Sequence, residues 1–93
     1  MLAISFDIVI SDLRTHYGDS YNRAYYEIKN LLENHSFEWF QGNTYITQSD
    51  DLCTLFEAIS SLSKIEWFKK SVRDIRAFIV ESLSDFTDTV KNR

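Results

Sequence analysis

The first ten residues, MLAISFDIVI, alternate between large apolar side chains and side chains that are mostly small or polar. A period of two predicts a β-strand, over residues 2–10, whose two faces meet different surroundings. One face is entirely apolar and consists of Leu2, Ile4, Phe6, Ile8 and Ile10. The segment has no basic region before it and carries Asp7 within it, so we interpret it as a strand and not as a signal peptide. The fold therefore needs a second layer that covers this face.

Two amphipathic helices supply candidates for that layer. Apolar residues recur at helical spacing over residues 20–35, and Asp19 or Ser20 is suited to cap this first helix. The second helix is predicted to be capped by Ser49, with Cys53 as a small core residue beside its buried side. That buried side is expected to consist of Leu52, Leu55, Phe56, Ile59 and Leu62.

The remaining segments complete an alternating order of strands and helices. The stretch FEWFQGNTYIT predicts two short strands around a Gly42-Asn43 turn, and SKIEWFKK predicts a connector. Residues 71–82 are predicted to form the last strand, and Ser84 to cap a short tail helix. The order βαββαβ predicts one ferredoxin-like α+β domain over 1–93, with an antiparallel sheet, both main helices on one face and a short C-terminal helix.

Composition is consistent with a single cytoplasmic domain. The chain has 93 residues, of which 44% are hydrophobic, and this suffices for a core of its own. Cys53 is the single cysteine and cannot form an intrachain disulfide, which favours a reducing compartment. No apolar run approaches the about 18 residues that a membrane helix needs. We therefore expect a cytoplasmic protein that does not associate with a membrane.

Both faces of the last predicted strand mix apolar and charged residues. One face would carry Val72, Asp74, Arg76, Phe78 and Val80, and the other Arg73, Ile75, Ala77, Ile79 and Glu81. The pattern therefore does not decide which face the helices cover. Because a strand that is apolar on both sides needs a second cover, we expect a two-fold homodimer that buries the open face or edge of the sheet. The charges would then lie at the rim of the dimer.

Basic residues are concentrated just before and within this strand. The net charge is −4, yet five of the ten basic residues fall between positions 64 and 76: Lys64, Lys69, Lys70, Arg73 and Arg76. Such clustering is typical of a surface that binds phosphates, and a solvated loop flank is the alternative. Trp67 and Phe68 fit either a stacking surface for single-stranded RNA or, more commonly, an anchor of the connector to the core.

Asp7 is the only charge in the apolar first strand. It could bond to backbone N–H groups or pair with Arg76, or it could be a general base or metal ligand near a dimer interface. His16 and His35 do not belong to a zinc-binding pattern, and no G-x-S-x-G, P-loop or Rossmann glycine pattern occurs. Hydride transfer, ATP chemistry and serine hydrolysis therefore have no support.

Several stretches resemble the virulence-associated protein D (VapD) family along essentially the whole chain. They are AISFD in the first strand, TYI after QG in the hairpin, IEWFKKSVRDIRAF over residues 65–78 and SDFT over residues 84–87. The resemblance implies a ferredoxin-like fold akin to the small nucleases of CRISPR adaptation, a homodimer, and an endoribonuclease that acts as a bacterial toxin. Some members of this family are paired with a small antitoxin protein.

The resemblance also implies roles for individual residues. Asp7 falls on the family's presumed catalytic position, and we expect Arg76 to act with it. Gln41, Gly42 and Asn43 match a Gln-Gly-Ser motif, in which Asn43 departs from the usual Ser and leaves the role of a hydroxyl there in doubt. The residues expected to contact RNA are Gln41, Asn43, Lys69, Lys70, Ser71 and Arg73, and Asp74 is expected to fix the structure or the interface.

RNA carries its own nucleophile, the 2′-OH, so the protein need only remove a proton and stabilise the charged phosphate. One carboxylate and one or two arginines suffice for this. A lone Asp7 in each subunit makes a poor site for Mg²⁺ unless a dimer pairs two copies, so the sequence leaves the metal requirement open. Two other classes remain: a dimeric module that binds RNA or a partner without cutting it, and a structural dimer whose charges only lock the interface.

Overall fold

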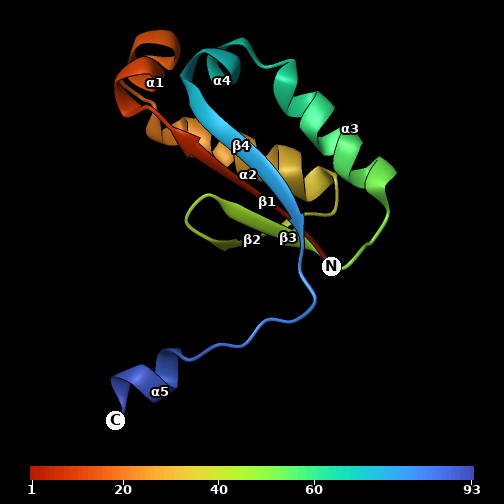
Figure 1. Ribbon diagram of the computed structural model, residues 1–93. Coiled ribbons are helices and arrows are strands. Elements are labelled where there is room, and N and C mark those ends of the chain that lie inside the picture. Colours follow the sequence, from red (N-terminus) through yellow and green to blue (C-terminus); the bar gives the residue numbers. More distant parts are fainter.

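The computed structural model describes residues 1–93 and has a sheet as one layer and helices as the other (Figure 1). The sheet is antiparallel, and its four strands lie in the order β2-β3-β1-β4. The strands are β1 (Leu2–Ile8), β2 (Glu38–Gln41), β3 (Thr44–Thr47) and β4 (Val72–Ile79). This order, with one strand inserted between β1 and β2, confirms the predicted ferredoxin-like α+β fold.

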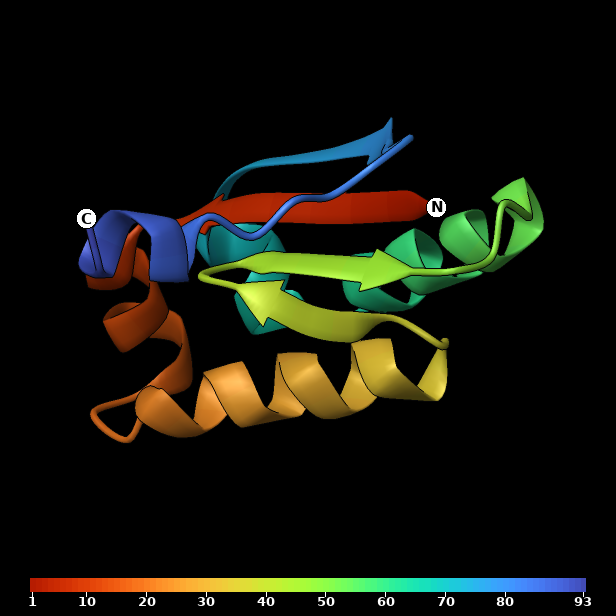
Figure 2. The same cartoon turned by 90° about the horizontal axis from the view of Figure 1, so that it is seen from below.

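Five helices connect and follow the strands: α1 (Ile10–Tyr17), α2 (Asn22–Asn34), α3 (Leu52–Ser63), α4 (Glu66–Ser71) and α5 (Thr87–Lys91). The short tail helix α5 stands apart from the domain at the end of an extended segment (Figure 1). Seen from below, this tail passes in front of the sheet, whereas α3 and α4 lie behind it (Figure 2). None of these helices is long and apolar enough to cross a membrane.

The helix-facing side of β1 is the centre of the core. Leu2, Ile4, Phe6 and Ile8 are at most 7% exposed, as the alternation predicted. The ring of Phe6 stacks on Tyr45 at a centroid distance of 6.2 Å and meets Phe68 edge-on at 5.5 Å. Burial of such large apolar side chains is the main driving force for folding, so this face supplies much of the stability.

The first strand is shorter than predicted. It ends at Ile8, and Ile10 begins α1 and is 42% exposed instead of joining the apolar face. Val9 turns the chain: its N–H donates to the carbonyl of Ser71, and its own carbonyl accepts from the N–H of Leu13, which is buried. The hydrogen bonds of Val9 to Ser71 and Leu13 therefore replace the strand pairing that the sequence predicts up to residue 10.

The predicted connector SKIEWFKK contains the helix α4 and not only a loop. Phe68 is buried, and Trp67 lies edge-on against Tyr17 of α1 with the ring centroids 5.1 Å apart. Trp67 and Phe68 therefore anchor α4 to the core and to α1. Phe68 is therefore not available to stack with RNA, whereas Trp67 is half-buried.

Ala24, Ile28 and Leu32 are the buried residues of α2, and they recur at the helical spacing on which the prediction of this helix rests. The helix begins at Asn22 without the side-chain cap expected from Asp19 or Ser20. At its end, the Nε2 atom of His35 lies 3.0 Å from the hydroxyl of Ser61 on α3. This hydrogen bond gives His35 a structural partner.

The predictions for α3 and α5 need corrections. Asp51 caps α3 by accepting from the N–H of Cys53 at 2.9 Å, while the hydroxyl of Ser49 accepts from the N–H of Asp51 in the preceding turn. Cys53 is exposed, as are Leu52 and Phe56. The other predicted residues face the core, since Leu62 is buried and Leu55 and Ile59 are partly buried against it. The α5 helix begins at Thr87, whose N–H donates to Asp85, so Ser84 is not its cap.

The register of β4 decides which of its faces the helices cover. Ile75, Ala77 and Ile79 lie opposite Phe6, Ile4 and Leu2 of β1, and residues directly opposite in an antiparallel pair share a face. This set therefore points to the helix layer. The open face of β4 carries Asp74, Arg76 and Phe78, which lie opposite Asp7, Ser5 and Ala3.

Candidate active site

The sheet is irregular at one end, where β1 finishes and β4 begins. The β1–β4 register shifts between Asp7 and Ile8, so Arg73 of β4 has no partner of its own on β1. A second shift, in the β2–β3 pair, leaves Phe40 as the extra residue. β-Bulges of this kind re-aim side chains and are over-represented beside active sites. Both shifts lie at the same end of the sheet, since Ser5 pairs with Thr44 and Thr44 with Gln41.

Four charged residues gather there on the open face, and we call them the Asp–Arg cluster: Asp7, Arg73, Asp74 and Arg76. Asp7 and Asp74 are directly opposite across β1 and β4. The Nη1 atom of Arg73 lies 3.4 Å from Oδ2 of Asp7, and Nη1 of Arg76 lies 3.3 Å from Oδ1 of Asp74. Like charges directly opposite repel, and the two arginines offset this repulsion.

The ion pair of Asp7 is with Arg73 and not with Arg76, the partner considered from the sequence. The bulge explains the difference, because it brings the extra residue Arg73 to the same side of the sheet as Asp74. A regular strand would have pointed Arg73 toward the helices. Arg76 also lies on the open face, where it is the next residue of β4 after Asp74 and is opposite Ser5.

The cluster is open to solvent. The exposed fractions of its side chains are 55% for Asp7, 64% for Arg73, 42% for Asp74 and 75% for Arg76. Ion pairs this exposed stabilise a protein by only about 0–1 kcal/mol, because water screens them. The fold therefore gains little from these four charges, and they remain free to meet a charged ligand.

The open face of the sheet carries two hydroxyl groups beside the cluster. Ser5 and Thr44 are opposite each other in β1 and β3, with their oxygens 3.1 Å apart, and Ser5 is also opposite Arg76. Hydroxyls can donate to phosphate oxygens, so both residues are candidates for the site. The sequence reasoning did not single them out, although the alternation of β1 already placed Ser5 on the face of Asp7.

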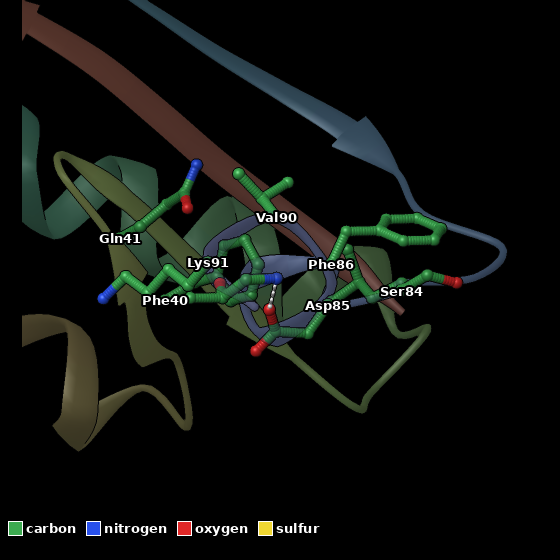
Figure 3. Close-up of a pocket in the computed structure, with 9 residues that line it drawn as sticks. Phe40, Gln41, Ser84, Asp85, Phe86, Val90 and Lys91 are labelled. Atoms are coloured by element: carbon green, nitrogen blue, oxygen red, sulfur yellow. Dashed lines mark hydrogen bonds between the residues drawn. The ribbon is translucent and has the colours of Figure 1, made fainter. Parts of the chain in front are cut away.

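The predicted hairpin residues flank this end of the sheet. The carbonyl of Asn43 accepts from the N–H of Phe6 at 3.2 Å, directly before Asp7. Gln41 shares the open face with Thr44 and lines a cavity of about 760 Å³ between β2 and the tail. Figure 3 shows Gln41 and Phe40 across this cavity from the tail residues, including Phe86 and Val90.

The predicted basic residues on α4 are at the surface. Lys69 and Lys70 are 53% and 56% exposed, and each has only a long ion pair with Glu66, at 3.7 and 3.9 Å. They occupy the last turn of α4, directly before β4. Such exposed, loosely paired ammonium groups can exchange Glu66 for a phosphate.

Ser71 requires a correction. It is completely buried, and its hydroxyl donates to the carbonyl of Trp67, one turn earlier in α4. Its side chain therefore cannot contact RNA. Ser71 instead joins α4 to β4, and its carbonyl accepts from the N–H of Val9 at 2.8 Å, which holds the end of β1 in place.

Metal ligands are sparse in the single chain. No group of three or more His, Cys, Asp or Glu side chains is placed to hold a metal ion. Asp7 and Asp74 are the two carboxylates of the cluster, and each is already paired with an arginine. Mg²⁺ typically binds to one or two carboxylates and completes its coordination shell with water and substrate phosphates. Asp7 and Asp74 would therefore be the ligands that the protein contributes.

The fold and this cluster define the protein as a small ferredoxin-like domain with ionisable groups on an uncovered sheet face. No protein-family model matches the sequence. Curated relatives do match it over nearly their full length. The chain is 56% identical to the endoribonuclease VapD of Dichelobacter nodosus over 91 residues, which is 98% of each chain.

Two further relatives agree. The endoribonuclease VapD of Helicobacter pylori is 51% identical over 94 residues, which covers 99% of this chain and 100% of the relative. The endoribonuclease VapD 1 of Riemerella anatipestifer is 51% identical over 86 residues, which covers 92% of this chain and 97% of the relative. The chain belongs to the VapD family, as its resemblance predicted.

Proposed function

We propose that the protein is an endoribonuclease that cleaves single-stranded RNA, such as mRNA, as the toxin of a bacterial toxin–antitoxin or virulence-associated system. Relatives at 51–56% identity are named as endoribonucleases, which supports the activity. The observation that carries the proposal is the solvent-exposed Asp–Arg cluster, in which each of two carboxylates is paired with a guanidinium group on the open face. An RNA substrate implies that the protein acts in the cytoplasm.

Asp7 is the general base in the proposed mechanism. Its carboxylate takes the proton of the 2′-OH of RNA, and the resulting oxyanion attacks the neighbouring phosphorus and displaces the 5′-oxygen of the next nucleotide. The products of this step are a 2′,3′-cyclic phosphate and, after the leaving oxygen gains a proton, a 5′-hydroxyl. A positioned general base contributes typically about 10²–10⁴-fold to the rate.

The two arginines stabilise the charge that builds up on phosphate. Arg76 is the predicted catalytic partner, and Arg73 is the closer one in the free protein, at 3.4 Å from Asp7. A phosphate that takes the guanidinium of Arg73 as its partner leaves the Asp7 carboxylate free to accept a proton. Guanidinium groups bind phosphate through two parallel hydrogen bonds, which also orients the phosphate.

A homodimer forms part of the proposal. Phe78 on the open face and Ile79 at the end of β4 are 47% and 72% exposed, and the tail carries the exposed Leu83, Phe86 and Val90. These apolar groups have no cover in one chain, and a second copy would cover them. Asp74 would then stand at the rim of the interface. A small antitoxin protein is a further expected partner, as in some members of the family.

The test is incubation of the purified protein with an end-labelled single-stranded RNA, with and without EDTA. We expect cleavage products that carry a cyclic phosphate and a 5′-hydroxyl, and no cleavage of a DNA strand of the same sequence, which lacks the nucleophile. Loss of cleavage in EDTA would assign Mg²⁺ to Asp7 and the RNA phosphates. Binding without cleavage under both conditions would make the protein a non-catalytic RNA-binding module.

A further inference from the structure

A second cavity lies between α2 and the β2–β3 hairpin, on the helix side of the sheet, whereas the Asp–Arg cluster is on the open face at the end of β1. It has a volume of about 460 Å³ and is lined mainly by aromatic residues: Tyr25, Tyr26, Trp39 and Tyr45, together with Lys29 and Asn43. Cavities of this size commonly hold small molecules or parts of larger ones. None of its lining residues is charged except Lys29.

The cavity adjoins the end of β1 that carries Asp7. Asn43 lines it, and the carbonyl of Asn43 accepts a hydrogen bond from Phe6, the residue before Asp7. Tyr25 gives a second link. Burial raises the pKa of its phenol most, and the charges of Tyr21 and Asp7 raise this pKa further. A nucleotide chain with a phosphate at Asp7 would pass around this end of the sheet, beside Asn43, to place a neighbouring base in the cavity.

Two of the aromatic side chains are more exposed than large apolar groups usually are. Tyr26 on α2 is 68% exposed and Trp39 on β2 is 55% exposed. The indole N–H of Trp39 donates to the carbonyl of Gly42 at 2.9 Å, so the ring is held in one orientation over the turn. A fixed, exposed ring loses little conformational entropy when a ligand stacks on it.

Lys29 adds a positive charge to one wall. Its side chain is 48% exposed, and its ammonium group lies 3.8 Å from Glu33, a long ion pair on the helix surface that contributes little. Lys29 can therefore bind a phosphate without a large loss elsewhere. Aromatic side chains that stack with bases, together with a cation for the backbone, are the usual means by which proteins bind single-stranded nucleic acid.

We propose that this cavity is a nucleobase subsite: it receives the base of a nucleotide next to the phosphate at Asp7, stacked on Trp39 and Tyr26, with Lys29 beside the nucleotide's phosphate. The inference rests on the proposed endoribonuclease function and extends it to substrate selection. Only an unstacked base can enter such a cavity, so the subsite selects single-stranded RNA over a duplex. Tyr25 and Asn43 connect the subsite to the cluster.

The first test measures binding without cleavage. A fluorescently labelled RNA oligonucleotide with 2′-O-methyl groups lacks the nucleophile and stays intact, and its anisotropy reports binding to the wild type and to the variants Trp39→Ala and Tyr26→Ala. We expect each variant to weaken binding by about 5- to 150-fold, the effect of removing one stacked base. Tyr26→Phe keeps the ring and should retain the wild-type affinity.

Phe40→Ala is the matched control. Phe40 is 41% exposed and adjacent to Trp39, yet it lines the cavity next to the tail and not the subsite. We expect this variant to bind the oligonucleotide as the wild type does. Equal loss in Phe40→Ala and Trp39→Ala, or wild-type affinity in both Trp39→Ala and Tyr26→Ala with unchanged melting temperatures, would overturn the subsite.

Cleavage kinetics separate a failure of this inference from a failure of the proposed function. With an RNA substrate, Tyr26→Ala should raise KM by about the same factor as it weakens binding and leave kcat within a few-fold of the wild type. If the wild type cleaves RNA and KM of Tyr26→Ala is unchanged, the function stands and the subsite is wrong. If the wild type cleaves no RNA but the variants still weaken binding, the endoribonuclease function is wrong.

Discussion

The two faces of β1 differ in what they do for the protein. The helix-facing side chains of Leu2, Ile4, Phe6 and Ile8 are at most 7% exposed, and the core is built around them. On the open face, the side chain of Asp7 is 55% exposed and makes one ion pair, with Arg73. Adjacent residues of one strand therefore contribute to stability and to the proposed chemistry almost independently, because their side chains point to opposite sides.

The two faces also differ in how much their side chains contribute to the free energy of unfolding. Deletion of a buried aromatic side chain typically costs about 3–5 kcal/mol, whereas an exposed ion pair contributes about 0–1 kcal/mol. The open face can therefore carry charges without a large loss of stability. A small domain can therefore hold Arg73, Asp74 and Arg76 within a strand, because none of them takes a place in the core.

The largest effect is expected on the helix side. Phe6→Ala removes a ring that packs against Tyr45 and Phe68, so unfolding in urea should show a loss of about 3–5 kcal/mol. Phe56→Ala, on α3 at 73% exposure, is the control and should change stability by no more than about 0.5 kcal/mol. Similar losses in both variants would contradict the assignment of stability to the buried side of β1.

The mass of the protein in solution tests whether the apolar residues of the open face form a dimer interface. Sedimentation at micromolar concentration should give twice the chain mass of 11.0 kDa, and Phe78→Asp should give the single-chain mass, because it places a charge in the interface. Phe56→Asp alters a more exposed ring on α3, in the other layer, and should remain dimeric. A wild-type species of 11.0 kDa would contradict the dimer.

Substitution of the two arginines tests whether the charged residues of the open face act in catalysis. Arg73→Ala and Arg76→Ala should each slow RNA cleavage by about 10²-fold, the low end of the effect of removing a donor to the transition-state charge. Their free energies of unfolding should stay within about 1 kcal/mol of the wild type, since both ion pairs are exposed. Loss of stability without loss of cleavage would assign these residues to the fold.

The smallest effect is expected at the lysines of α4. Changing both Lys69 and Lys70 to Gln should reduce the slope of log affinity against log salt by about 1.4, because each phosphate contact in a single strand contributes about 0.7. Lys91→Gln, in α5, is the control and should leave the slope unchanged. A wild-type slope in the double variant would make Lys69 and Lys70 ordinary solvated residues.

The sequence predicts the regular parts of this molecule better than its irregular end. Alternation identified β1 and its buried face, and the order of elements identified the fold. The bulge at Arg73 leaves no signal in the sequence, since it depends on how β1 and β4 align. For this reason the sequence offers Arg76, and not Arg73, as the partner of Asp7, while the mixed composition of both faces leaves the buried face of the last strand undecided.

Other differences arise from tertiary contacts. Ser71 looked like a surface residue among charges, but α4 buries it against the end of β1. Leu52 and Phe56 follow the same helical spacing as Leu55, Ile59 and Leu62, yet only the latter three pack on the core, together with Ala58. Tyr26 and Trp39 come from separate elements, so only the folded chain brings them to one cavity.

The most direct test of the account is Asp7→Asn, with melting temperature and RNA cleavage measured on the same preparation. The change keeps the size of the side chain and removes its charge. We predict a free energy of unfolding within about 1 kcal/mol of the wild type, because the pair with Arg73 is exposed. Cleavage should fall by about 10²–10⁴-fold. A variant that melts early yet cleaves at nearly the wild-type rate would make Asp7 a structural residue and contradict the central claim.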